Sequence, residues 1–464
     1  MVVCLKKLET SQASTPLARR DLPPPPDLPN FTVEAEPEAR PAAEERHSGT
    51  GLVRHAVSLD AGLDDAKVDQ DAAKVVRRLE RAGYEAYLVG GCVRDLLLGG
   101  TPKDFDIATS ARPDDVKALF RNCRVIGRRF RLAHVLFGGG KIIEVATFRR
   151  NPVSETPELD VDAADDLLIR SDNVFGEAHE DALRRDFTIN ALFYDIDRRQ
   201  VLDWCGGMEH LRARTIQTIG DPGVRFREDP VRILRAIKFA ARLDLGIAPD
   251  VYDAMVMNRQ ELSRAARPRI FEEIARLGRG AAIHRSMWLL WEVGAMAILL
   301  PELSSYLDDD EATEGELFFR RLGAIDRLTR AEGPLDDVVL WASILYEPLV
   351  EAVTGVRDVV GAAHDFLEPI VARVAMPRRI TDGVARIAAV LPRLKQGRMG
   401  RLVRSELVVP ALDVLEIDCI ARGASVDHVH AMRQEVTSAH GSARGGPGRA
   451  PGFYRGAARP ARRG

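Results

Sequence analysis

The chain has 464 residues, 45% of them hydrophobic, and a formal net charge of −3. This apolar content suffices for a large core, and the length favours about two to four domains. No apolar run approaches the roughly 20 residues that cross a bilayer, and the first residues lack the features of a secretory signal. The five cysteines are an odd number and form no Cys-x-x-Cys pair, which argues against disulfides and against a zinc site. We therefore expect a cytoplasmic protein with reduced thiols and no membrane contact.

The first 60 residues are unsuited to a folded core. They contain four consecutive prolines at 23–26 and an acidic, alanine-rich run at 34–45. Such a segment buries too little apolar surface to offset the entropy of ordering, which predicts a disordered arm. The first helix is predicted over residues 71–82, where apolar residues recur at helical spacing and Gly83 follows as a stop.

A short apolar strand, a Gly-Gly turn and a helix are expected to follow one another between residues 84 and 98. Residues 86–89 read as a buried strand and 93–98 as the opening of a helix. Gly90 and Gly91 let backbone N–H groups approach an anion closely, and a helix N-terminus favours phosphate. A Gly-Gly pair by itself is more often an ordinary turn.

Two aspartates follow this turn closely. Asp104 and Asp106 are two residues apart in a segment, 103–107, that reads as an extended strand, so both side chains should point to one face. Mg²⁺ takes oxygen ligands and is commonly completed by substrate phosphates. An isolated Asp-x-Asp pair is usually a solvated strand face, but beside a phosphate-binding turn it predicts phosphoryl or nucleotidyl transfer.

Residues 88–95 and 102–106 together resemble the head motif of class II template-independent nucleotidyltransferases, the family of bacterial poly(A) polymerases and CCA-adding enzymes. The resemblance implies an α+β fold, in which a polymerase-β-like palm is followed by an all-α neck and body. It implies that Asp104 and Asp106 hold the catalytic metals. The nucleotide's phosphates would meet Gly90, Gly91 and Arg94. Cys92 stands where relatives usually have glycine or a similarly small residue.

Residues 127–135 pack three arginines, Arg128, Arg129 and Arg131, among apolar side chains. Composition alone favours a solvated edge strand. The segment resembles the Gly-basic-basic-Phe-x-Leu-x-His signature of bacterial poly(A) polymerases, whereas CCA-adding relatives tend to have a shorter sequence there. The resemblance implies that these arginines bind RNA.

Residues 141–148 alternate as a sheet strand does. Glu144 would approach the metal site if this strand neighbours the one that holds Asp104, but an exposed strand residue is the favoured interpretation. Residues 149–170 are rich in proline and aspartate and are predicted to form a mobile loop.

The segment 180–192 contains Arg184, Arg185 and Asp186 before a set of buried apolar residues. Composition alone is compatible with a salt-bridged helix. In the family this Arg-Arg-Asp motif contacts the sugar and phosphates of the nucleotide. The resemblance therefore places Asp186 with the catalytic carboxylates and both arginines at the nucleotide.

Residues 230–243 are predicted to form a helix with Pro230 in its first turn, and Asp229, Arg232 and Arg235 would lie three apart on one face. This could be an ordinary salt-bridged helix. The segment also resembles the family's Glu-Asp-x-x-Arg motif, whose Asp and Arg read the edge of the base. An aspartate acceptor beside an arginine donor suits such reading. Lys238 replaces a further arginine that relatives often have.

Helical periodicity dominates from about residue 250. The predicted helices span 268–277, 285–299, 317–329, 337–352 and 382–391. His364 and Asp365 suggest the metal dyad of HD phosphohydrolases, but a paired or exposed histidine is favoured, since only one other histidine lies between 250 and 400.

The tail over 441–464 is glycine-rich, contains six arginines and has no acidic residue. It is predicted to be disordered and basic. Binding of RNA through Arg455, Arg459 and Arg462 and a merely solubilising role are both compatible with this composition.

The predicted organisation is a disordered arm (1–60), a nucleotidyltransferase head (68–220), a helical nucleotide-recognition neck (221–280), an all-α RNA-binding body (281–435) and the basic tail (441–464). The expected function is that of a poly(A) polymerase, which uses ATP and two Mg²⁺ ions to add AMP to RNA 3′ ends. RNA-decay proteins are possible partners. A CCA-adding tRNA nucleotidyltransferase is the alternative enzyme. The alternative from another class is an inactive RNA-binding protein of the same fold. The presence of all the expected acidic residues argues against this alternative.

Overall fold

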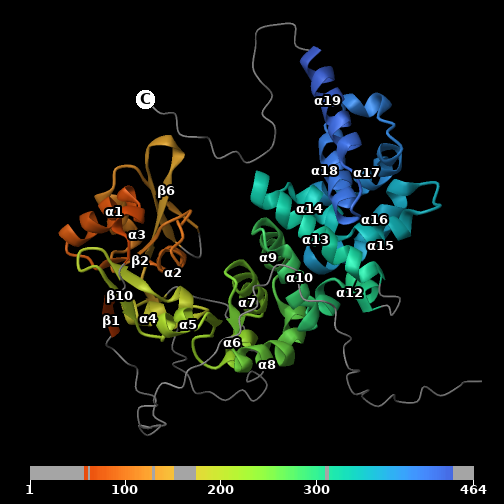
Figure 1. Cartoon of the computed structure of the whole chain (residues 1–464). Coiled ribbons are helices and arrows are strands. Elements are labelled where there is room, and N and C mark those ends of the chain that lie inside the picture. The colour runs from red at the N-terminus through yellow and green to blue at the C-terminus, as the bar shows by residue number, and fades with distance from the viewer. Residues whose placement is uncertain (1–56, 61–62, 128–130, 151–173, 309–312, 443–464) are drawn as a thin grey trace, which may run out of the picture. The chain divides into compact units, whose positions relative to one another are not determined.

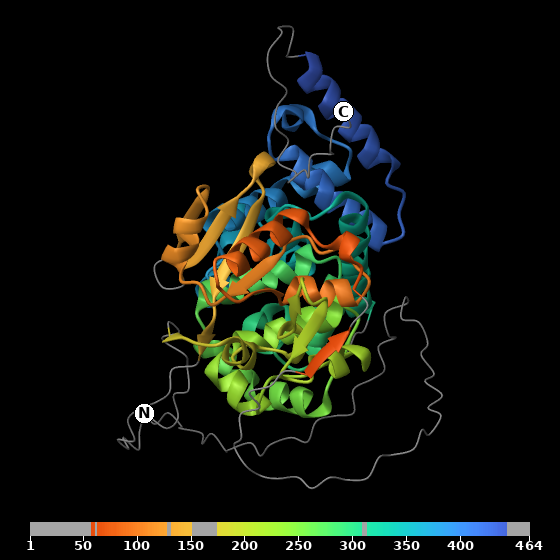
Figure 2. The same ribbon diagram turned by 90° about the vertical axis from the view of Figure 1, so that its left-hand side faces the viewer.

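The computed structural model describes residues 57–60, 63–127, 131–150, 174–308 and 313–442. Strands are confined to the N-terminal part of these residues, and the later part is helical (Figures 1 and 2). This arrangement confirms the predicted α+β class, with a palm-like sheet domain followed by helices. Residues 1–56 of the predicted arm, 151–170 of the predicted loop and 443–464 of the predicted tail lie outside the described residues. The ends of these predictions are corrected by the structure, because residues 57–60 form strand β1 of the large sheet, 149–150 form β7, and 441–442 end helix α19.

One mixed sheet of eight strands forms the first domain, in the order β1-β10-β9-β2-β3-β6-β5-β4. Only β3 and β6 are parallel neighbours within it, and all other adjacent pairs are antiparallel. Its strands are β1 (Val57–Asp60), β2 (Ala86–Val89), β3 (Asp106–Thr109), β4 (Cys123–Ile126), β5 (Leu132–Leu136), β6 (Ile142–Thr147), β9 (Phe193–Asp195) and β10 (Gln200–Asp203). Two small sheets pair β7 (Arg149–Arg150) with β8 (Val174–Phe175) and β11 (Thr215–Ile216) with β12 (Gly246–Ile247).

Helices α1, α3 and α4 pack against the large sheet. Helix α1 contacts β2 and β3, and α3 contacts β4, β5 and β6. Helix α4 supplies Ala178 and Ala182 to an apolar cluster on the sheet face that holds Val89 and Ala108. The helices of this domain are α1 (Gln70–Arg81), α2 (Gly91–Leu97), α3 (Pro113–Leu119), α4 (Ala178–Leu183) and α5 (Gly207–Arg212), with short 3₁₀ turns at η1 (Asp65–Lys67), η2 (Gly138–Gly140) and η3 (Thr188–Asn190).

Residue alternation along β3 orients the acidic residues. Asp106 shares a face with Ala108, and so lies on the face of the apolar cluster, whereas Ile107 is buried on the opposite face. The strand begins only at Asp106, which corrects the prediction that both aspartates lie on it. Asp104 belongs to the preceding loop, although Phe105 between them is buried as the alternation requires.

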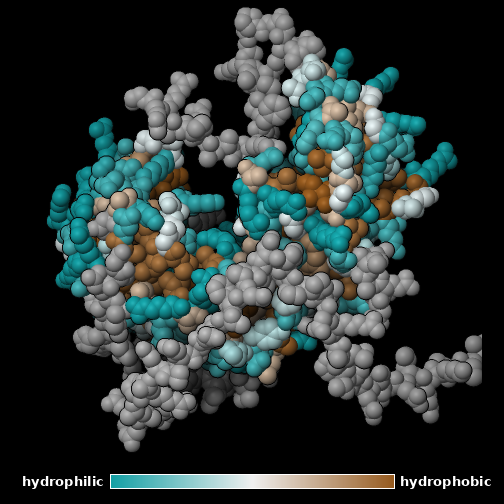
Figure 3. Space-filling model, in the orientation of Figure 1, coloured by the Kyte–Doolittle hydropathy of each residue, from teal (hydrophilic) through white to brown (hydrophobic). Residues whose placement is uncertain are grey.

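The remaining elements are helical. They are α6 (Pro222–Glu228), α7 (Val231–Arg242), α8 (Pro249–Asn258), η4 (Arg259–Arg264), α9 (Arg267–Arg279), α10 (Ile283–Glu292), α11 (Met296–Leu299), α12 (Pro301–Asp308), α13 (Thr313–Glu332), α14 (Asp337–Ile344), α15 (Tyr346–Val353), α16 (Val359–Val374), α17 (Arg378–Lys395), η5 (Gly400–Arg404), α18 (Val408–Ala421) and α19 (Asp427–Ser442). In the view of Figure 3, hydrophobic residues gather at the palm and between the helices, and hydrophilic residues cover most of the remaining coloured surface.

Two of the predicted helices are each divided in the structure. The segment 285–299 breaks where Gly294 adopts a φ of +75°, a left-handed conformation that favours glycine. The segment 337–352 is divided at Leu345 into α14 and α15. Apolar periodicity continued through both interruptions, so it could not reveal them.

A buried ion cluster joins the last helices. The guanidinium of Arg321 is fully buried, pairs with Glu347 and lies 2.5 Å from Oδ1 of Asp418. The hydroxyl of Tyr346 donates to the other Asp418 oxygen at 2.9 Å. Burial raises the pKa of Asp418, but Arg321 and Lys395 outweigh it and hold the value at about 2. The cluster thus keeps a charged carboxylate inside the body.

Candidate active site

The turn after β2 requires glycine at its first position. Gly90 has φ +74° and ψ −126°, and a Cβ atom there would lie 3.0 Å from Nη1 of Arg185. The Gly90 N–H donates to the carbonyl of Leu192 at 3.1 Å, which ties the turn to the strand segment that follows η3. Helix α2 begins at Gly91. The turn is therefore fixed at the end of β2, beside Arg185.

Carboxylates gather at the start of β3. Asp106 lies directly beside Glu144 in the parallel register of β3 and β6. Partial desolvation raises the pKa of the solvent-accessible Asp106 carboxyl to about 6, and the negative charges of Glu144 and Asp104 contribute in the same direction. Arg185 opposes this shift. Asp104, Asp106 and Glu144 thus form a region of unfavourable negative charge with one cation close by.

This set of donors suits Mg²⁺, which takes carboxylate oxygens and retains water. In the described part of the chain, no three carboxylate, imidazole or thiol groups are already close enough together to hold an ion. A metal would therefore have to draw the side chains closer. Desolvation is the main cause of the raised pKa of Asp106, and the charges of Glu144 and Asp104 add to it, so a bound cation would relieve repulsion already present in the protein.

Glu144 is a further candidate for the acidic site, although the sequence favoured an exposed strand residue at this position. Its side chain is about half exposed, yet Oε1 lies 3.5 Å from Nε2 of His134 on β5. His134, Glu144 and Asp106 form one row across three adjacent strands. The conditional prediction that Glu144 approaches the acids if its strand neighbours β3 is confirmed by the register.

Arg184 and Arg185 are both held by a buried aspartate, Asp181, that the sequence interpretation did not single out. Arg185 donates from Nη2 to Asp181 at 2.9 Å, and Nη1 of Arg184 lies 3.5 Å from the same carboxylate. The guanidinium of Arg185 also lies 5.1 Å from the centre of the Phe193 ring. The motif is not a single helix, since α4 ends at Leu183 and a 3₁₀ turn follows.

Asp186 is bonded on both carboxylate oxygens. Oδ2 accepts from Nε of Arg235 at 2.7 Å, and Oδ1 accepts from Nδ2 of Asn190 at 3.1 Å and from the Phe187 N–H at 2.8 Å. Burial acts to raise the pKa of Asp186, but Arg235 and these hydrogen bonds lower it to about 2. In this structure the carboxylate joins the palm to α7, and its place among the catalytic acids stays a prediction.

Arg94 belongs to the same polar chain. Its side chain is 3% exposed, and Nη1 donates to Oδ1 of Asn190 at 2.5 Å while Nη2 donates to Asp95 at 2.6 Å. The sequence predicted a direct contact with phosphates, whereas the structure buries this guanidinium behind the turn. Asn190 therefore connects Arg94 to Asp186, a role that only the folded arrangement reveals.

Asp186→Asn is expected to destabilise the protein by roughly 2–3 kcal/mol, because it removes the nearer charged partner of the partly buried Arg235 and leaves the Glu273 carboxylate, 3.8 Å away. The native pKa of about 2 lies below the ordinary 3.8, so this stabilisation is present above about pH 4 and is lost as the pH falls toward 2. Urea unfolding at several pH values measures it. An unchanged unfolding midpoint at neutral pH would contradict the assignment.

The residues of the predicted base-reading face are each held by other side chains. Asp229 precedes α7, and its carboxylate accepts from Arg269 at 2.7 Å. Arg232 is 7% exposed and donates to Glu228 and to the Arg225 carbonyl, both at 2.9 Å. The helix starts at Val231, so Asp229 lies just before it, and the Asp229 carbonyl accepts from the Arg232 N–H at 3.0 Å. Apolar residues on the inner face of α7, such as Ile233 and Ile237, are buried.

Glu273 on α9 completes the charge network of the neck. It is buried, and its carboxylate accepts from Nζ of Lys238 at 2.7 Å. Arg235 lies 3.8 Å from the same carboxylate. Lys238 therefore makes a compact ion pair here, which does not need the planar fork of an arginine.

Other predicted RNA-binding residues are only partly described. Arg131 is exposed and pairs with Asp114 on α3 at 2.8 Å. Arg128, Arg129, Arg455, Arg459 and Arg462 lie outside the described residues. His364 lies 3.6 Å from Asp382 at the surface, consistent with the favoured interpretation of a paired or exposed histidine. None of the described helices is long and apolar enough to cross a membrane.

Comparison with known proteins shows two matching family models. Residues 86–217 match the poly A polymerase head domain, and residues 244–307 match a probable RNA and SrmB-binding site of polymerase A. The chain is 39% identical over 365 residues to poly(A) polymerase I of Salmonella typhi, covering 75% of this chain and 78% of that protein.

CCA-adding enzymes are also related to this chain. The Geobacillus stearothermophilus enzyme is 38% identical over 230 residues, covering 50% of this chain and 54% of that protein. The crystal structure of the Bacillus stearothermophilus CCA-adding enzyme in complex with CTP matches with a TM-score of 0.60 and 29% identity, covering 80% of this chain and 82% of that one. The longer match to poly(A) polymerase I, together with the head-domain model and the palm geometry, shows that the chain is an enzyme of the bacterial poly(A) polymerase family, within the tRNA nucleotidyltransferase group.

Proposed function

We propose that this enzyme transfers AMP from ATP to the 3′-hydroxyl of RNA without a nucleic-acid template. The observation that carries the proposal is the position of Asp106, whose pKa is raised to about 6 by desolvation and by Glu144, with Arg185 close by. An acidic centre that gains from a divalent cation, next to a fixed glycine turn and an arginine, suits nucleotidyl transfer. The long similarity to poly(A) polymerase I supports adenylate as the transferred group.

Asp104 and Asp106 are proposed as ligands of two Mg²⁺ ions, with Glu144 as a third carboxylate of the same centre. When bound, such ions would lower the pKa of the RNA 3′-hydroxyl and neutralise charge on the departing pyrophosphate. The protein's own contribution is to hold Asp106 and Glu144 on adjacent strands, β3 and β6, with Asp104 in the loop that leads into β3. In-line transfer requires this fixed geometry more than any covalent step on the protein.

Arg185 and the Gly90–Gly91 turn are proposed to receive the phosphates of ATP. Arg185 is kept in place by Asp181 and by the carbonyl of Asn190, so little side-chain entropy would be lost when phosphate binds. Arg184 shares the Asp181 anchor. Arg94 is proposed to act indirectly, by fixing Asn190 behind the turn.

Asp229 is proposed to read the base, because its side chain is about one-fifth exposed and is oriented by Arg269. Arg232 and Arg235 are proposed to position the reading surface through Glu228 and Asp186. An oriented carboxylate can accept a hydrogen bond from the exocyclic amino group of adenine, a donor that cytosine also has and that guanine and uracil replace with a carbonyl oxygen.

The test is incubation of the purified protein and Mg²⁺ with labelled, unstructured RNA and each nucleoside triphosphate in turn. ATP is expected to give a ladder of extended products. Absence of extension with any triphosphate would contradict the proposal. The CCA-adding alternative is favoured by one observation, the 29% identity to an enzyme solved with CTP, and products made with CTP and ATP distinguish the two.

Glu144→Gln is expected to lower the pKa of Asp106, because it removes a negative charge that raises that pKa. The acid limb of the rate–pH profile should move to lower pH, since Asp106 would keep its charge further below about pH 6. The maximal rate should fall if Glu144 helps to hold the ions. Rates measured from pH 5 to 8 check this prediction. The control variant is Glu351→Gln, which removes one negative charge at an exposed position. Equal rate–pH profiles for the two variants would contradict the prediction.

A further inference from the structure

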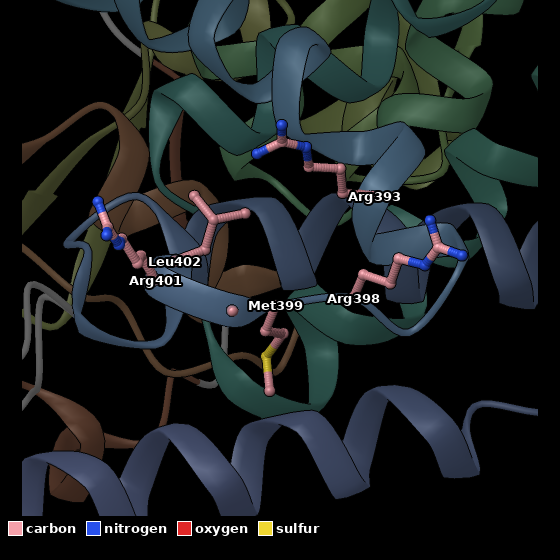
Figure 4. Close-up of a pocket in the computed structure, with 6 residues that line it drawn as sticks. Arg393, Arg398, Met399, Arg401 and Leu402 are labelled. Atoms are coloured by element: carbon pink, nitrogen blue, oxygen red, sulfur yellow. The ribbon is translucent and has the colours of Figure 1, made fainter.

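A basic hollow lies at the junction between α17 and η5 in the body. It has a volume of about 460 Å³ and is lined by Arg393, Arg398, Met399, Gly400, Arg401 and Leu402. Figure 4 shows Arg393 at the end of α17 and Arg398 and Arg401 on the segment that follows. The hollow lies outside the residues matched by the two family models, 86–217 and 244–307.

The charge of this segment is of one sign. Between residues 393 and 405 it contains Arg393, Lys395, Arg398, Arg401 and Arg404 and no acidic residue. Lys395 pairs with Asp418 at 3.0 Å. The four arginines are exposed, and within the described part of the chain no ion pair joins any of them to a carboxylate. Positive charge therefore accumulates here without internal compensation.

Neighbouring arginines behave differently. Arg422 pairs with Asp418 at 2.9 Å, and Arg433 pairs with Asp413 at 2.7 Å and with Glu416. The body thus has carboxylates for arginines on α18 and α19. A group of arginines left without such partners is a candidate site for an anion from outside the protein.

Backbone geometry places these arginines together. Gly397 and Gly400 have φ values of +71° and +50°, so the chain turns sharply after α17 at positions that favour glycine. The N–H of Arg398 donates to the carbonyl of Arg393 at 2.9 Å and closes the turn. In the 3₁₀ helix η5, residues three apart lie on one edge, which aligns Arg401 with Arg404.

We propose that this arginine hollow binds the phosphodiester backbone of the RNA substrate at a distance along the strand from its reacting 3′ end. Arginine forks suit phosphate oxygens, and several arginines in sequence suit a polyanion better than a single small anion. None of the lining residues is aromatic, so the hollow offers no stacking surface for bases and should bind without sequence preference. The identity of the bound strand as substrate rests on the proposed function.

The test compares the full-length double variant R398E/R401E with the control R327E/R357E, which changes the charge equally at exposed arginines that do not line the hollow. Fluorescence anisotropy of labelled oligoadenylates of about 8 and about 30 nucleotides gives Kd over a range of salt. For the longer RNA, R398E/R401E should raise Kd at least about tenfold and reduce the salt slope by about 1.4, the effect of two lost phosphate contacts. The control should match the wild type, and the shorter RNA should show a smaller change.

Each other outcome would overturn the proposal. Equal effects of the two double variants would indicate general charge, and an unchanged Kd for the longer RNA would show that the hollow does not contact RNA. A raised KM for ATP with unchanged RNA binding would assign the hollow to a free polyphosphate instead. Because Kd is measured without turnover, a failure of this inference is separable from a failure of the proposed adenylyl transfer, which appears as absence of extension by the wild type. Circular dichroism and Tm confirm that all variants are folded.

Discussion

Asp106→Asn is expected to reduce kcat for AMP addition by at least about a hundredfold, a loss of about 2.7 kcal/mol of transition-state stabilisation. Asparagine keeps the size of the side chain but removes the negative charge that a divalent ion requires. Asp104→Asn should act in the same direction. The measurement is single-turnover extension of a labelled RNA at saturating ATP and Mg²⁺.

The same variant should be at least as stable as the wild type without metal. The pKa of Asp106 in the folded protein is about 6, above its ordinary 3.8, so the folded state binds this proton more tightly than the unfolded state does. Its contribution to stability is therefore greatest below about pH 4 and is lost as the pH rises through 6. Removing the ionisable group should raise the metal-free Tm at neutral pH and flatten its pH dependence between 4 and 6.

The control for this pair of measurements is Asp114→Asn, which removes an exposed carboxylate that pairs with Arg131. It should leave both kcat and Tm close to the wild-type values. Retention of more than a tenth of the wild-type kcat by Asp106→Asn would limit its loss to under about 1.4 kcal/mol and exclude a main ligand. A lower metal-free Tm would show that the carboxylate is structural.

Local sequence signals predicted the first elements of the palm well. The helix over 71–82 and the strand over 86–89 agree with α1 and β2 within one residue, because apolar periodicity and Gly83 act within a few residues. The requirement for glycine at position 90 likewise follows from a local turn. The first residue of β3 was less predictable. Asp104 and Asp106 alternate with apolar residues, and this alternation does not show at which residue the hydrogen bonds of the sheet begin.

Non-local pairing explains what the sequence could not show. Glu144 lies beside Asp106 only because β6 is the parallel neighbour of β3, and no pattern within residues 141–148 specifies that neighbour. The same limit applies to the ion pair between Asp186 and Arg235, which are 49 positions apart. Asp181 and Asn190 were not singled out, because their importance lies in which arginines they hold.

The charged motif of the neck shows how a small change in a helix boundary alters a predicted site. Counting residues three apart placed Asp229 and Arg232 on one face, but α7 begins at Val231 and leaves Asp229 at the end of α6. Asp229 is then oriented by Arg269, a residue 40 positions away. A base-reading surface on this enzyme would therefore be assembled from α9 as well as from the motif itself.

The enzyme is expected to prefer ATP over CTP by at least about a hundredfold in kcat/KM and to extend unstructured RNA by many adenylates. Such discrimination corresponds to about 2.7 kcal/mol of differential transition-state binding, which an oriented polar group can supply when the wrong base leaves it unpaired. The warrant is the match to poly(A) polymerase I over 75% of this chain, against 50% for a CCA-adding enzyme. Steady-state rates with each triphosphate on one RNA give the ratio.

If Asp229 reads the base, Asp229→Ala should reduce the ATP:GTP ratio of kcat/KM at least about tenfold, because the carboxylate accepts from the amino group of adenine but faces a carbonyl oxygen in guanine. The control is Asp250→Ala, which removes an exposed carboxylate in the first turn of α8 that accepts from Gln217. This control should keep the wild-type ratio. A tRNA lacking its terminal nucleotides tests the alternative directly, since a poly(A) polymerase has no reason to stop after three additions. Equal kcat/KM for CTP and ATP, or quantitative arrest after one C-C-A on that tRNA, would assign the enzyme to CCA addition.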